Sequence, residues 1–351
     1  MRIVVVGATG NVGTSVVRAL IPDPQVESIV GVARRLPPDQ RIEKVEWRSA
    51  DIRSANLVEL FRGADAVIHL AWLIQPSRDL AELRSVNVDG SARVFEAVGE
   101  AGVPALVYAS SVGAYSPGPK DRAVDESWPT GGIESSFYSR HKAEVERLLD
   151  RFEHERPEVR SVRLRPGLIF KREAGAEIRR LFAGPFLPSR LLRKELIPVV
   201  PDIPRLRFQA VHSYDVGEAY RMAALADAAG PFNVAAEPVL DPRELARLLE
   251  ARAVRMPAGL VRTAADITWR LHLQPTPPGW VDMALGVPIM DSSRARRELG
   301  WQPRHSAGEA LLDVLAGIHD SAGDRTPPLS PDAGGPARLR EVATRVGGQN
   351  P

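Results

Sequence analysis

The stretch Ile3-Val4-Val5-Val6-Gly7-Ala8-Thr9-Gly10-Asn11-Val12-Gly13 decides the fold of this 351-residue chain. Its first four residues form a β-branched run, which is typical of a strand buried on both faces of a parallel sheet. Three glycines follow at regular spacing, and an apolar pattern with helical period begins at Val12. A strand, a glycine turn and a helix in this order predict a dinucleotide-binding βα unit.

The three glycines would each serve this turn differently. Gly7 permits the tight turn, Gly10 lets the backbone approach a pyrophosphate, and Gly13 allows the helix to pack closely on the strand. The pyrophosphate would meet free N–H groups at the helix start. The spacing is G-x-x-G-x-x-G rather than G-x-G-x-x-G, and an ordinary βα turn is the alternative. The other loop residues expected to contact the cofactor are Thr9, Asn11 and Val12.

A second strand is predicted at residues 28–33, and the residues after it bear on the choice of cofactor. An acid at the end of this strand would bind the ribose 2′-hydroxyl of NAD. Ala33 occupies that position, and Arg34 and Arg35 follow it. Because a guanidinium suits a 2′-phosphate, the pair favours NADP, with NAD or a merely solvated arginine pair as the alternatives.

Two further strands, predicted at residues 45–48 and 66–71, end where the cofactor should pass. Asp51 is placed to accept from the adenine amino group and Ile52 to lie against the ring, although Asp51 could instead cap a helix. Leu70 and Ala71 end the fourth strand. His69 is expected to be a core histidine, and no metal site is predicted, because no second ligand lies at a suitable spacing.

Tyr138 and Lys142 lie four residues apart and therefore on one face of a predicted helix. A free phenol has a pKa near ~10 and is a poor base at neutral pH. A nearby ammonium favours the phenolate, so we expect Lys142 to lower the pKa of Tyr138. Tyr138 could then exchange a proton with an alcohol or a carbonyl. A chance Tyr-x-x-x-Lys pair is the alternative.

Two more positions are candidates for the same site. A hydroxyl from Ser110 or Ser111 follows the predicted strand at residues 106–109, where doubly wound sheets bind ligands. Asn87 interrupts a long helical pattern; it could be a surface or capping residue, or it could hold a water behind Lys142. Six strands alternating with helices through about residue 165 predict a right-handed parallel sheet with helices on both faces. Ser111 and Tyr138 would then meet near the nicotinamide end of the bound cofactor.

The remaining chain predicts a smaller lobe and a tail. We expect a Rossmann domain at residues 1–170 with a return to the sheet edge at about 206–236, and a substrate-binding lobe mainly at 171–319. Residues 171–205 combine basic and apolar groups that could cover an apolar or anionic substrate, touch an acidic membrane surface, or form a solvated helix pair. Trp269, Trp280 and Met283 would be the selectivity wall of an apolar cleft, or else lobe core. Residues 320–351 are rich in glycine and proline, which predicts a disordered tail, with a short helix at residues 337–346 as the alternative.

Composition excludes several classes of protein. The net charge of +2, from 46 basic and 44 acidic residues, gives no nucleic-acid signal. The absence of cysteine excludes disulfides, thiolate metal sites and cysteine nucleophiles, and fits a reducing cytoplasm. The N-terminal apolar run is too short for a signal peptide or a membrane span.

Taken in order, these motifs resemble the extended short-chain dehydrogenase/reductase family, also called the NAD-dependent epimerase/dehydratase family. The resemblance spans residues 1 to about 315. The residues that carry it are Gly7-x-x-Gly10-x-x-Gly13, Asp51-Ile52, His69-Leu70-Ala71, Asn87-Val88-x-Gly90, Ser110-Ser111-x-x-x-Tyr115, Tyr138-x-x-x-Lys142, Arg165-Pro166-Gly167, Val211-His212-x-x-Asp215-Val216 and Leu299-Gly300-Trp301-x-Pro303.

The resemblance implies roles for the matching residues. Tyr138 would be the catalytic acid/base, and Lys142 would lower its pKa and reach the nicotinamide ribose. Ser111 would hydrogen-bond the reacting oxygen, Asn87 would complete the catalytic set, and Pro166 would lie against the cofactor. A hydride would move between the nicotinamide and a substrate carbon. A homodimer through the asparagine and tyrosine helices is also typical of the family.

Departures from the family pattern bear on the reaction. The resembling dehydratases carry an Asp-Glu pair after the catalytic hydroxyl, but here Val112-Gly113 follows Ser111, which argues against dehydration. The stretch Leu164-Arg165-Pro166-Gly167-Leu168-Ile169-Phe170 is more similar to the reductase branch than to the epimerases. The sequence therefore predicts an NAD(P)-dependent oxidoreductase acting on a carbonyl or secondary alcohol of a small molecule. A sugar-nucleotide epimerase and a non-catalytic dinucleotide sensor are the alternatives.

Overall fold

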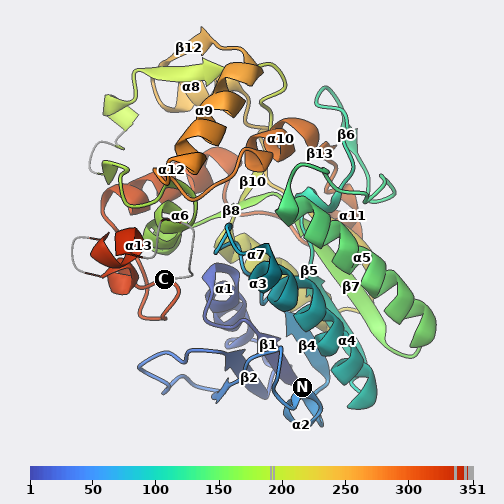
Figure 1. The fold of residues 1–351 in the computed structure, drawn as a ribbon. Coiled ribbons are helices and arrows are strands. Elements are labelled where there is room, and N and C mark those ends of the chain that lie inside the picture. Colours follow the sequence, from blue (N-terminus) through green and yellow to red (C-terminus); the bar gives the residue numbers. More distant parts are fainter. Residues whose placement is uncertain (190–191, 193, 336–337, 344–345, 347–351) are drawn as a thin grey trace.

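The structure is a computed structural model that describes residues 1–189, 192, 194–335, 338–343 and 346 (Figure 1). Its centre is a seven-stranded sheet in the order β11-β7-β5-β4-β1-β2-β3, and every pairing in it is parallel. The strands are β1 (Arg2–Val6), β2 (Ser28–Ala33), β3 (Val45–Ser49), β4 (Ala66–His69), β5 (Ala105–Ala109), β7 (Arg160–Pro166) and β11 (Gly230–Val234). The predicted doubly wound α/β fold is confirmed.

Helices cover both faces of the sheet (Figure 1). Because side chains alternate along a strand, Ile3 and Val5 of β1 join one core while Val4 and Val6 join the other. The first core includes α1 (Asn11–Leu20) and α7 (Ser213–Leu225). The second includes α2 (Leu57–Phe61), α4 (Gly90–Glu100) and α5 (Phe137–Glu155).

The chain order reverses at β1, which fixes where a ligand can bind. From β1 the chain builds β2 and β3 on one side, then crosses over to build β4, β5 and β7 on the other. Val6 and His69 are paired at the carboxyl ends of β1 and β4, and the loops that follow these strands diverge from there. Ligands of open α/β sheets bind in the crevice at such a reversal.

Asn87 lies in a π-helical segment, η1 (Ser85–Asp89), that joins α3 (Leu80–Arg84) to α4. All of its backbone is helical, so α3, η1 and α4 form one continuous rod with a widened turn. Such π-bulges are frequent at functional sites. The bulge changes which residues face the sheet, and it turns Asn87 fully inward.

Outside the central sheet, the described residues form three short parallel pairs of strands. They are β8 (Leu168–Phe170) with β10 (Ala210–His212), β9 (Val199–Asp202) with β12 (Arg252–Arg255), and β6 (Ala123–Val124) with β13 (Ile289–Met290). Of the expected return to the sheet at 206–236, β11 joins the edge, whereas β10 pairs with β8 instead. The helices between residues 171 and 319, apart from α7, are α6 (Gly175–Ile178), α8 (Pro242–Leu248), α9 (Ala258–Arg270), α10 (Gly279–Gly286), α11 (Ser293–Glu298) and α12 (Ala307–His319).

The described part of the tail is packed, which differs from the expected disorder. It contains η7 (Pro331–Gly334) and α13 (Leu339–Ala343), and Leu329 is fully buried. A buried ion pair joins Glu341 to Arg179 at 2.5 Å, and the Arg338 guanidinium donates to two carbonyls of the 185–189 segment. These partners lie far away in sequence, so composition could not reveal them. The expectation for residues 336–337, 344–345 and 347–351 lies outside the described residues.

Within the described part of the chain, no helix combines the length and apolar character needed to cross a membrane.

Candidate active site

A cleft of about 540 Å³ lies at the carboxyl ends of the central strands and is closed on its far side by the second lobe. It gathers residues from the glycine loop, from the ends of β2, β4, β5 and β7, from α5 and from the lobe. All the cofactor-binding residues predicted from the sequence line it: Gly7, Thr9, Gly10, Asn11, Val12, Gly13, Arg34, Arg35, Asp51, Ile52, Leu70, Ala71, Tyr138, Lys142 and Pro166. Ser111 lines it too.

The glycine loop is shaped for a dinucleotide. Gly7 has a φ of +93°, and a Cβ there would lie 2.7 Å from the Ala71 backbone nitrogen. A Cβ on Gly13 would lie 2.2 Å from the Gly7 carbonyl oxygen. At Gly10, by contrast, the nearest protein atom would be 3.6 Å from a Cβ, so protein packing does not demand glycine there. The open space above Gly10 faces the cleft and fits a phosphate at the start of α1.

Lys171, directly after β8, supports this loop from behind. Its ammonium is buried and donates to the Asn11 carbonyl at 2.9 Å and to the Thr14 hydroxyl at 2.6 Å. Burial lowers the pKa of Lys171 to about 8. No local pattern in the sequence predicts this contact, because the two segments meet only through the tertiary fold. Lys171 therefore ties the second lobe to the first turn of α1.

Arg34 and Arg35 are exposed at the end of β2. Neither guanidinium forms an ion pair with a carboxylate of the described residues. Burial, and then the charges of Arg34 and Arg340, lower the pKa of Arg35. The cleft therefore carries, at the end of β2, two guanidinium groups without an ion-pair partner among the described residues, which suits an anionic ligand group.

Asp51 lines the cleft, but a protein partner already holds its carboxylate. The Arg53 guanidinium donates to both carboxylate oxygens at 2.7–3.1 Å and also pairs with Glu82 at 2.8 Å. The hydrogen bond from Arg53 lowers the pKa of Asp51. Asp51 does not cap the following helix, because Asn56 caps α2. Any contact with an adenine amino group would have to be shared with Arg53.

Tyr138 lies in the first turn of α5, whose start is capped by the Ser136 side chain. Burial raises the pKa of the Tyr138 phenol, and a hydrogen bond with Ser111 opposes this rise. The expected lowering is therefore wrong for this structure. The Ser111 hydroxyl oxygen also accepts from the Gly113 N–H at 3.0 Å, which directs it toward Tyr138. The two predicted catalytic hydroxyls are thus brought together.

The Lys142 ammonium explains why the expectation failed. It donates to the Ala109 carbonyl at 2.6 Å and lies 3.5 Å from the centroid of the Trp72 ring, but 5.9 Å from that of Tyr138. Burial lowers the pKa of Lys142 well below its usual range, and the charge of Glu146 opposes the shift. Lys142 faces the cleft with its charge stabilised by a carbonyl and an indole rather than by a phenolate.

Asn87, expected as the fourth catalytic group, does not line the cleft. Its amide nitrogen donates to the Leu73 carbonyl and its amide oxygen accepts from the Leu73 N–H, both at 2.7 Å. The π-bulge turns the Asn87 side chain toward the backbone of Leu73, in the loop after β4, rather than toward Lys142. Asn87 therefore holds the segment that follows β4. His69 is buried as expected and is hydrogen-bonded to Ser91 at 2.9 Å.

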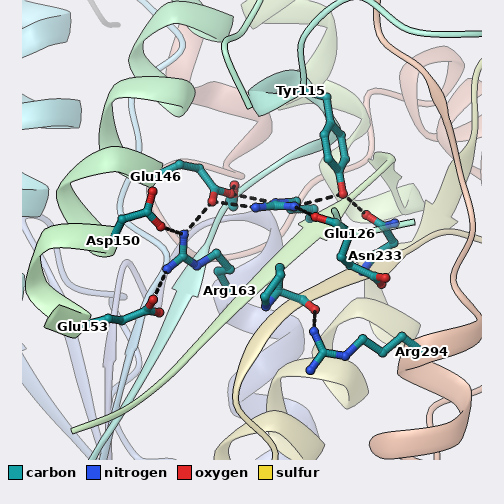
Figure 2. Close-up of polar contacts among 11 residues, drawn as sticks. Tyr115, Glu126, Glu146, Asp150, Glu153, Arg163, Asn233 and Arg294 are labelled. Atoms are coloured by element: carbon teal, nitrogen blue, oxygen red, sulfur yellow. Dashed lines mark hydrogen bonds and ion pairs between the residues drawn. The ribbon is translucent and has the colours of Figure 1, made fainter. Parts of the chain in front are cut away.

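A buried ion-pair network joins α5 to β7 (Figure 2). Its centre is Glu146 on α5, which accepts from Arg163 at 2.9 Å and from Arg165 at 2.8 Å, and which also accepts from the Ser110 hydroxyl. Burial opposes ionisation of Glu146, but the two guanidinium groups outweigh it and lower its pKa to about 2. Because the Ser110 hydroxyl is held by Glu146, the geometry favours Ser111 as the residue available to a substrate.

The same network continues to Asn233 on β11, at the edge of the central sheet (Figure 2). Arg165 donates to the Tyr115 hydroxyl at 3.1 Å, and that hydroxyl donates to the Asn233 amide oxygen at 2.6 Å. Glu126 accepts from the Asn233 backbone N–H at 2.8 Å. Burial raises the pKa of Tyr115 to about 12, so this tyrosine stays neutral. Its phenol serves the scaffold rather than the cleft.

The side of the cleft beyond Tyr138 is aromatic and apolar. The Trp280 ring lies 5.0 Å from that of Tyr138, and Trp72 lies 5.8 Å away on another side. Phe182 packs edge-on against Trp280 at 5.0 Å, and Met283 also lines the cleft. Of the three residues predicted to form a wall, Trp280 and Met283 line the cleft, whereas Trp269 does not. Phe182 was missed, because only the fold brings its segment, η4 (Arg179–Ala183), to the cleft.

Two more lining residues had no recognisable signal in the sequence. Glu177 on α6 faces the cleft, and burial raises the pKa of its carboxyl to about 7, against the charges of Arg180 and Lys171. Pro328 comes from the tail, and its carbonyl accepts from the Arg180 guanidinium at 2.5 Å. Among the described residues, no group of three or more potential ligands is placed to hold a metal ion.

Comparisons with known proteins agree with this fold. The model of the NAD dependent epimerase/dehydratase family matches residues 3–235, and the chain belongs to that family. An uncharacterized protein of Mycobacterium tuberculosis is 28% identical over 92% of this chain, but the chain spans only 31% of that relative's length.

Two characterised proteins extend the comparison. L-arabinose 1-dehydrogenase (NAD(P)(+)) of Haloferax volcanii is 36% identical over 31% of this chain and 41% of its own length. The solved structure of Thermus thermophilus UDP-glucose 4-epimerase in complex with NAD has a TM-score of 0.65 and 21% identity, covering 91% of this chain and 99% of that one. At this identity the structural similarity concerns the fold.

Proposed function

We propose that the protein is an NAD(P)-dependent oxidoreductase that interconverts a carbonyl and a secondary alcohol. The observation that carries the proposal is the meeting of Ser111, Tyr138 and Lys142 in the cleft that also contains the glycine loop. The dinucleotide would lie from the arginines at the end of β2, across the start of α1, to the end of β5. It would supply or accept the hydride, as nicotinamide cofactors do.

The residues of the chain would act on the substrate oxygen. Ser111 would hydrogen-bond this oxygen, and Tyr138 would give it a proton during reduction or take one during oxidation. Because burial raises the pKa of Tyr138, the phenol is protonated at neutral pH and is ready to act as an acid. The protonation state therefore favours carbonyl reduction. Asn87 would be a positioning residue that holds Leu73 and the adjoining cleft wall.

NADP is the proposed cofactor, and NAD is the alternative. Ala33 offers no carboxylate to a ribose 2′-hydroxyl, and the unpaired Arg34 and Arg35 guanidinium groups suit a 2′-phosphate. The Thermus relative was solved with NAD, and the Haloferax relative is named for both cofactors. Titration with each reduced cofactor separately decides between them.

A sugar-nucleotide epimerase is the second candidate, favoured by the family match and by the Thermus structure. It would use the same tyrosine, keep its dinucleotide between turnovers and consume none. The dinucleotide content of the purified protein distinguishes the two candidates, because an oxidoreductase must release its cofactor. Location in the cytoplasm and a homodimer through α4 and α5 stay predictions, and the molecular mass in solution tests the second.

The decisive variant is Tyr138→Phe, which keeps the ring and removes the proton. We expect turnover of a carbonyl substrate to fall at least roughly a hundredfold, with cofactor affinity unchanged. Turnover is measured as the rate at which the reduced cofactor is oxidised. Tyr214→Phe is the matched control, because Tyr214 is hydrogen-bonded to Glu173 outside this cleft. Unchanged turnover in Tyr138→Phe would refute the mechanism.

A further inference from the structure

We propose that the substrate is an uncharged, mainly apolar ketone or secondary alcohol that carries a ring, and not a nucleoside diphosphate sugar. The inference rests on the proposed function, because it concerns the molecule on which Tyr138 would act. Two features of the cleft carry it: the aromatic residues around Tyr138, and the positions of the cationic side chains.

Three aromatic residues, Trp72, Trp280 and Phe182, form what we call the aromatic wall. They come from three separate places in the chain: the segment after β4, helix α10 and the segment η4. Trp72 meets Tyr138 nearly edge-on at 73°, Trp280 lies tilted by 37° against it, and Phe182 stands at 87° to Trp280. The rings support one another in favourable pair geometries, so the wall is a fixed apolar surface beside the reacting hydroxyl.

The side of the cleft opposite the glycine loop, which we call the lobe side, offers few other hydrogen-bonding groups. Its only side-chain amide, among the described lining residues of this side, belongs to Gln75. That amide donates to the Leu181 carbonyl at 2.8 Å and accepts from the Ser77 N–H at 2.7 Å, so it is already used. A sugar would lose water from several hydroxyls without replacement, which is costly. The apolar lining residues of this side are Leu73, Ile74, Val112, Ile178, Leu181 and Met283.

The cations of the cleft are not placed for a substrate diphosphate, which would need arginine, lysine or a free helix start. Arg34 and Arg35 lie at the end of β2, on the cofactor side. The Lys142 ammonium is bound to the Ala109 carbonyl. Arg180 alone, among the described basic residues, lines the lobe side; it donates to the tail carbonyl of Pro328, and the Glu177 carboxyl lines the cleft three residues before it.

Binding without turnover gives the sharpest test. Protein saturated with NADP+, or with NAD+ if that is the cofactor bound, cannot reduce a ketone, so equilibrium affinities can be measured directly by calorimetry. The probes are cyclohexanone, 4-methylcyclohexanone, 2-decalone and UDP-glucose. We expect the affinity of the ketones to rise about fourfold for each added methylene that is buried, so that 2-decalone binds roughly a hundredfold more tightly than cyclohexanone. UDP-glucose should not bind at a concentration of about 1 mM.

Matched variants locate the binding surface. Phe182→Ala should weaken 2-decalone binding at least roughly tenfold and leave cofactor affinity unchanged. Phe186→Ala is the control, because Phe186 follows closely in the chain but is 56% exposed and does not line the cleft. Circular dichroism of both variants confirms that they are folded.

Three results would overturn the proposal: UDP-glucose binding with a Kd below about 100 μM, 2-decalone binding no tighter than cyclohexanone, or equal 2-decalone affinities in the two phenylalanine variants. No measurable ketone binding at about 10 mM would overturn it as well. None of these results depends on hydride transfer, so each leaves the Tyr138→Phe test of the reaction standing. Conversely, an inactive protein that binds 2-decalone as expected would refute the reaction and retain the binding surface.

Discussion

The ammonium of Lys142 lies 3.5 Å from the centre of the Trp72 ring, on the face where a cation is attracted to the indole. The same ammonium donates to the Ala109 carbonyl, and burial lowers its pKa. The cation that the family mechanism pairs with tyrosine is thus stabilised here by a tryptophan that also borders the substrate side of the cleft. Charge placement and substrate shape are therefore coupled through Trp72.

Replacing Trp72 with leucine should disturb both functions. Loss of the cation–π contact removes about 1–2 kcal/mol from the charged form of Lys142, so its pKa should fall further. We expect turnover to drop roughly tenfold and the high-pH side of its profile, where Lys142 loses its charge, to move to lower pH. Trp72→Phe, which keeps a weaker aromatic face, should show a smaller change. Equal profiles for the two variants would show that the contact is incidental.

The raised pKa of Tyr138 predicts opposite pH dependences for the two directions of the reaction. The phenol must be protonated to reduce a carbonyl, and burial keeps it protonated through neutral pH. Loss of the Tyr138 proton should therefore not limit reduction up to about pH 9, whereas oxidation, which needs the phenolate, should rise with pH. Initial rates of both directions at saturating cofactor test this. A plateau of oxidation below pH 8 would contradict the direction of the shift.

Arg35 should set the preference for the phosphorylated cofactor. Removing one of two guanidinium groups from a 2′-phosphate should raise the Kd of NADPH at least roughly tenfold, or about 1.4 kcal/mol, and leave that of NADH unchanged. Fluorescence titration of Arg35→Ala measures both. Arg48→Ala is the control, because Arg48 is exposed and paired with Glu46 on β3. An equal loss for both cofactors would place Arg35 away from the ribose.

Glu146 should make the fold sensitive to acid. Its folded-state pKa of about 2 lies below the ordinary value of 4.5, so its stabilisation is complete above pH 4.5 and is lost as the pH falls toward 2. Glu146→Gln leaves two buried guanidinium groups undercompensated and should lower the free energy of unfolding by roughly 3 kcal/mol at pH 7.

Urea unfolding between pH 2.5 and 7 checks this expectation. The difference between wild type and Glu146→Gln should shrink as the pH falls, because the wild type loses the same charge. Asp150→Asn is the control: Asp150 also pairs with Arg163, but its side chain is 59% exposed, so its variant should change stability by less than about 1 kcal/mol. A difference between wild type and Glu146→Gln that does not depend on pH would refute the assignment.

The sheet and the cofactor loop could be predicted because their signals are local. The alternation of Ile3, Val4, Val5 and Val6 between two cores and the glycine spacing after them are written in consecutive residues. The pairing of β10 with β8 could not be predicted, because a short apolar strand carries no local signal that specifies which strand it pairs with. The contact of Asn87 with Leu73 could not be predicted, because a π-bulge shifts helical register and no pattern with a regular period reports such a shift.

The parts of the site that escaped prediction are those supplied by distant segments. Lys171, Glu177 and Phe182 lie within twelve residues of one another, in a stretch where only a mixture of basic and apolar groups was evident. Their roles depend on which way each side chain points once β8 and α6 have docked. The order of the tail depends in the same way on the buried pair of Arg179 with Glu341. Such pairs form only in the tertiary structure, so composition does not predict them.

Gly7 and Pro328 line one cleft although they lie near opposite ends of the chain. Domains form from the N-terminus during synthesis, so the glycine loop is complete long before its far wall leaves the ribosome. A nascent chain that extends only through the glycine loop would offer its dinucleotide an open groove, and docking of the segment around Pro328 would cover that groove. Cofactor bound before this docking would be enclosed by it, whereas cofactor that arrives afterwards would have to enter a covered cleft.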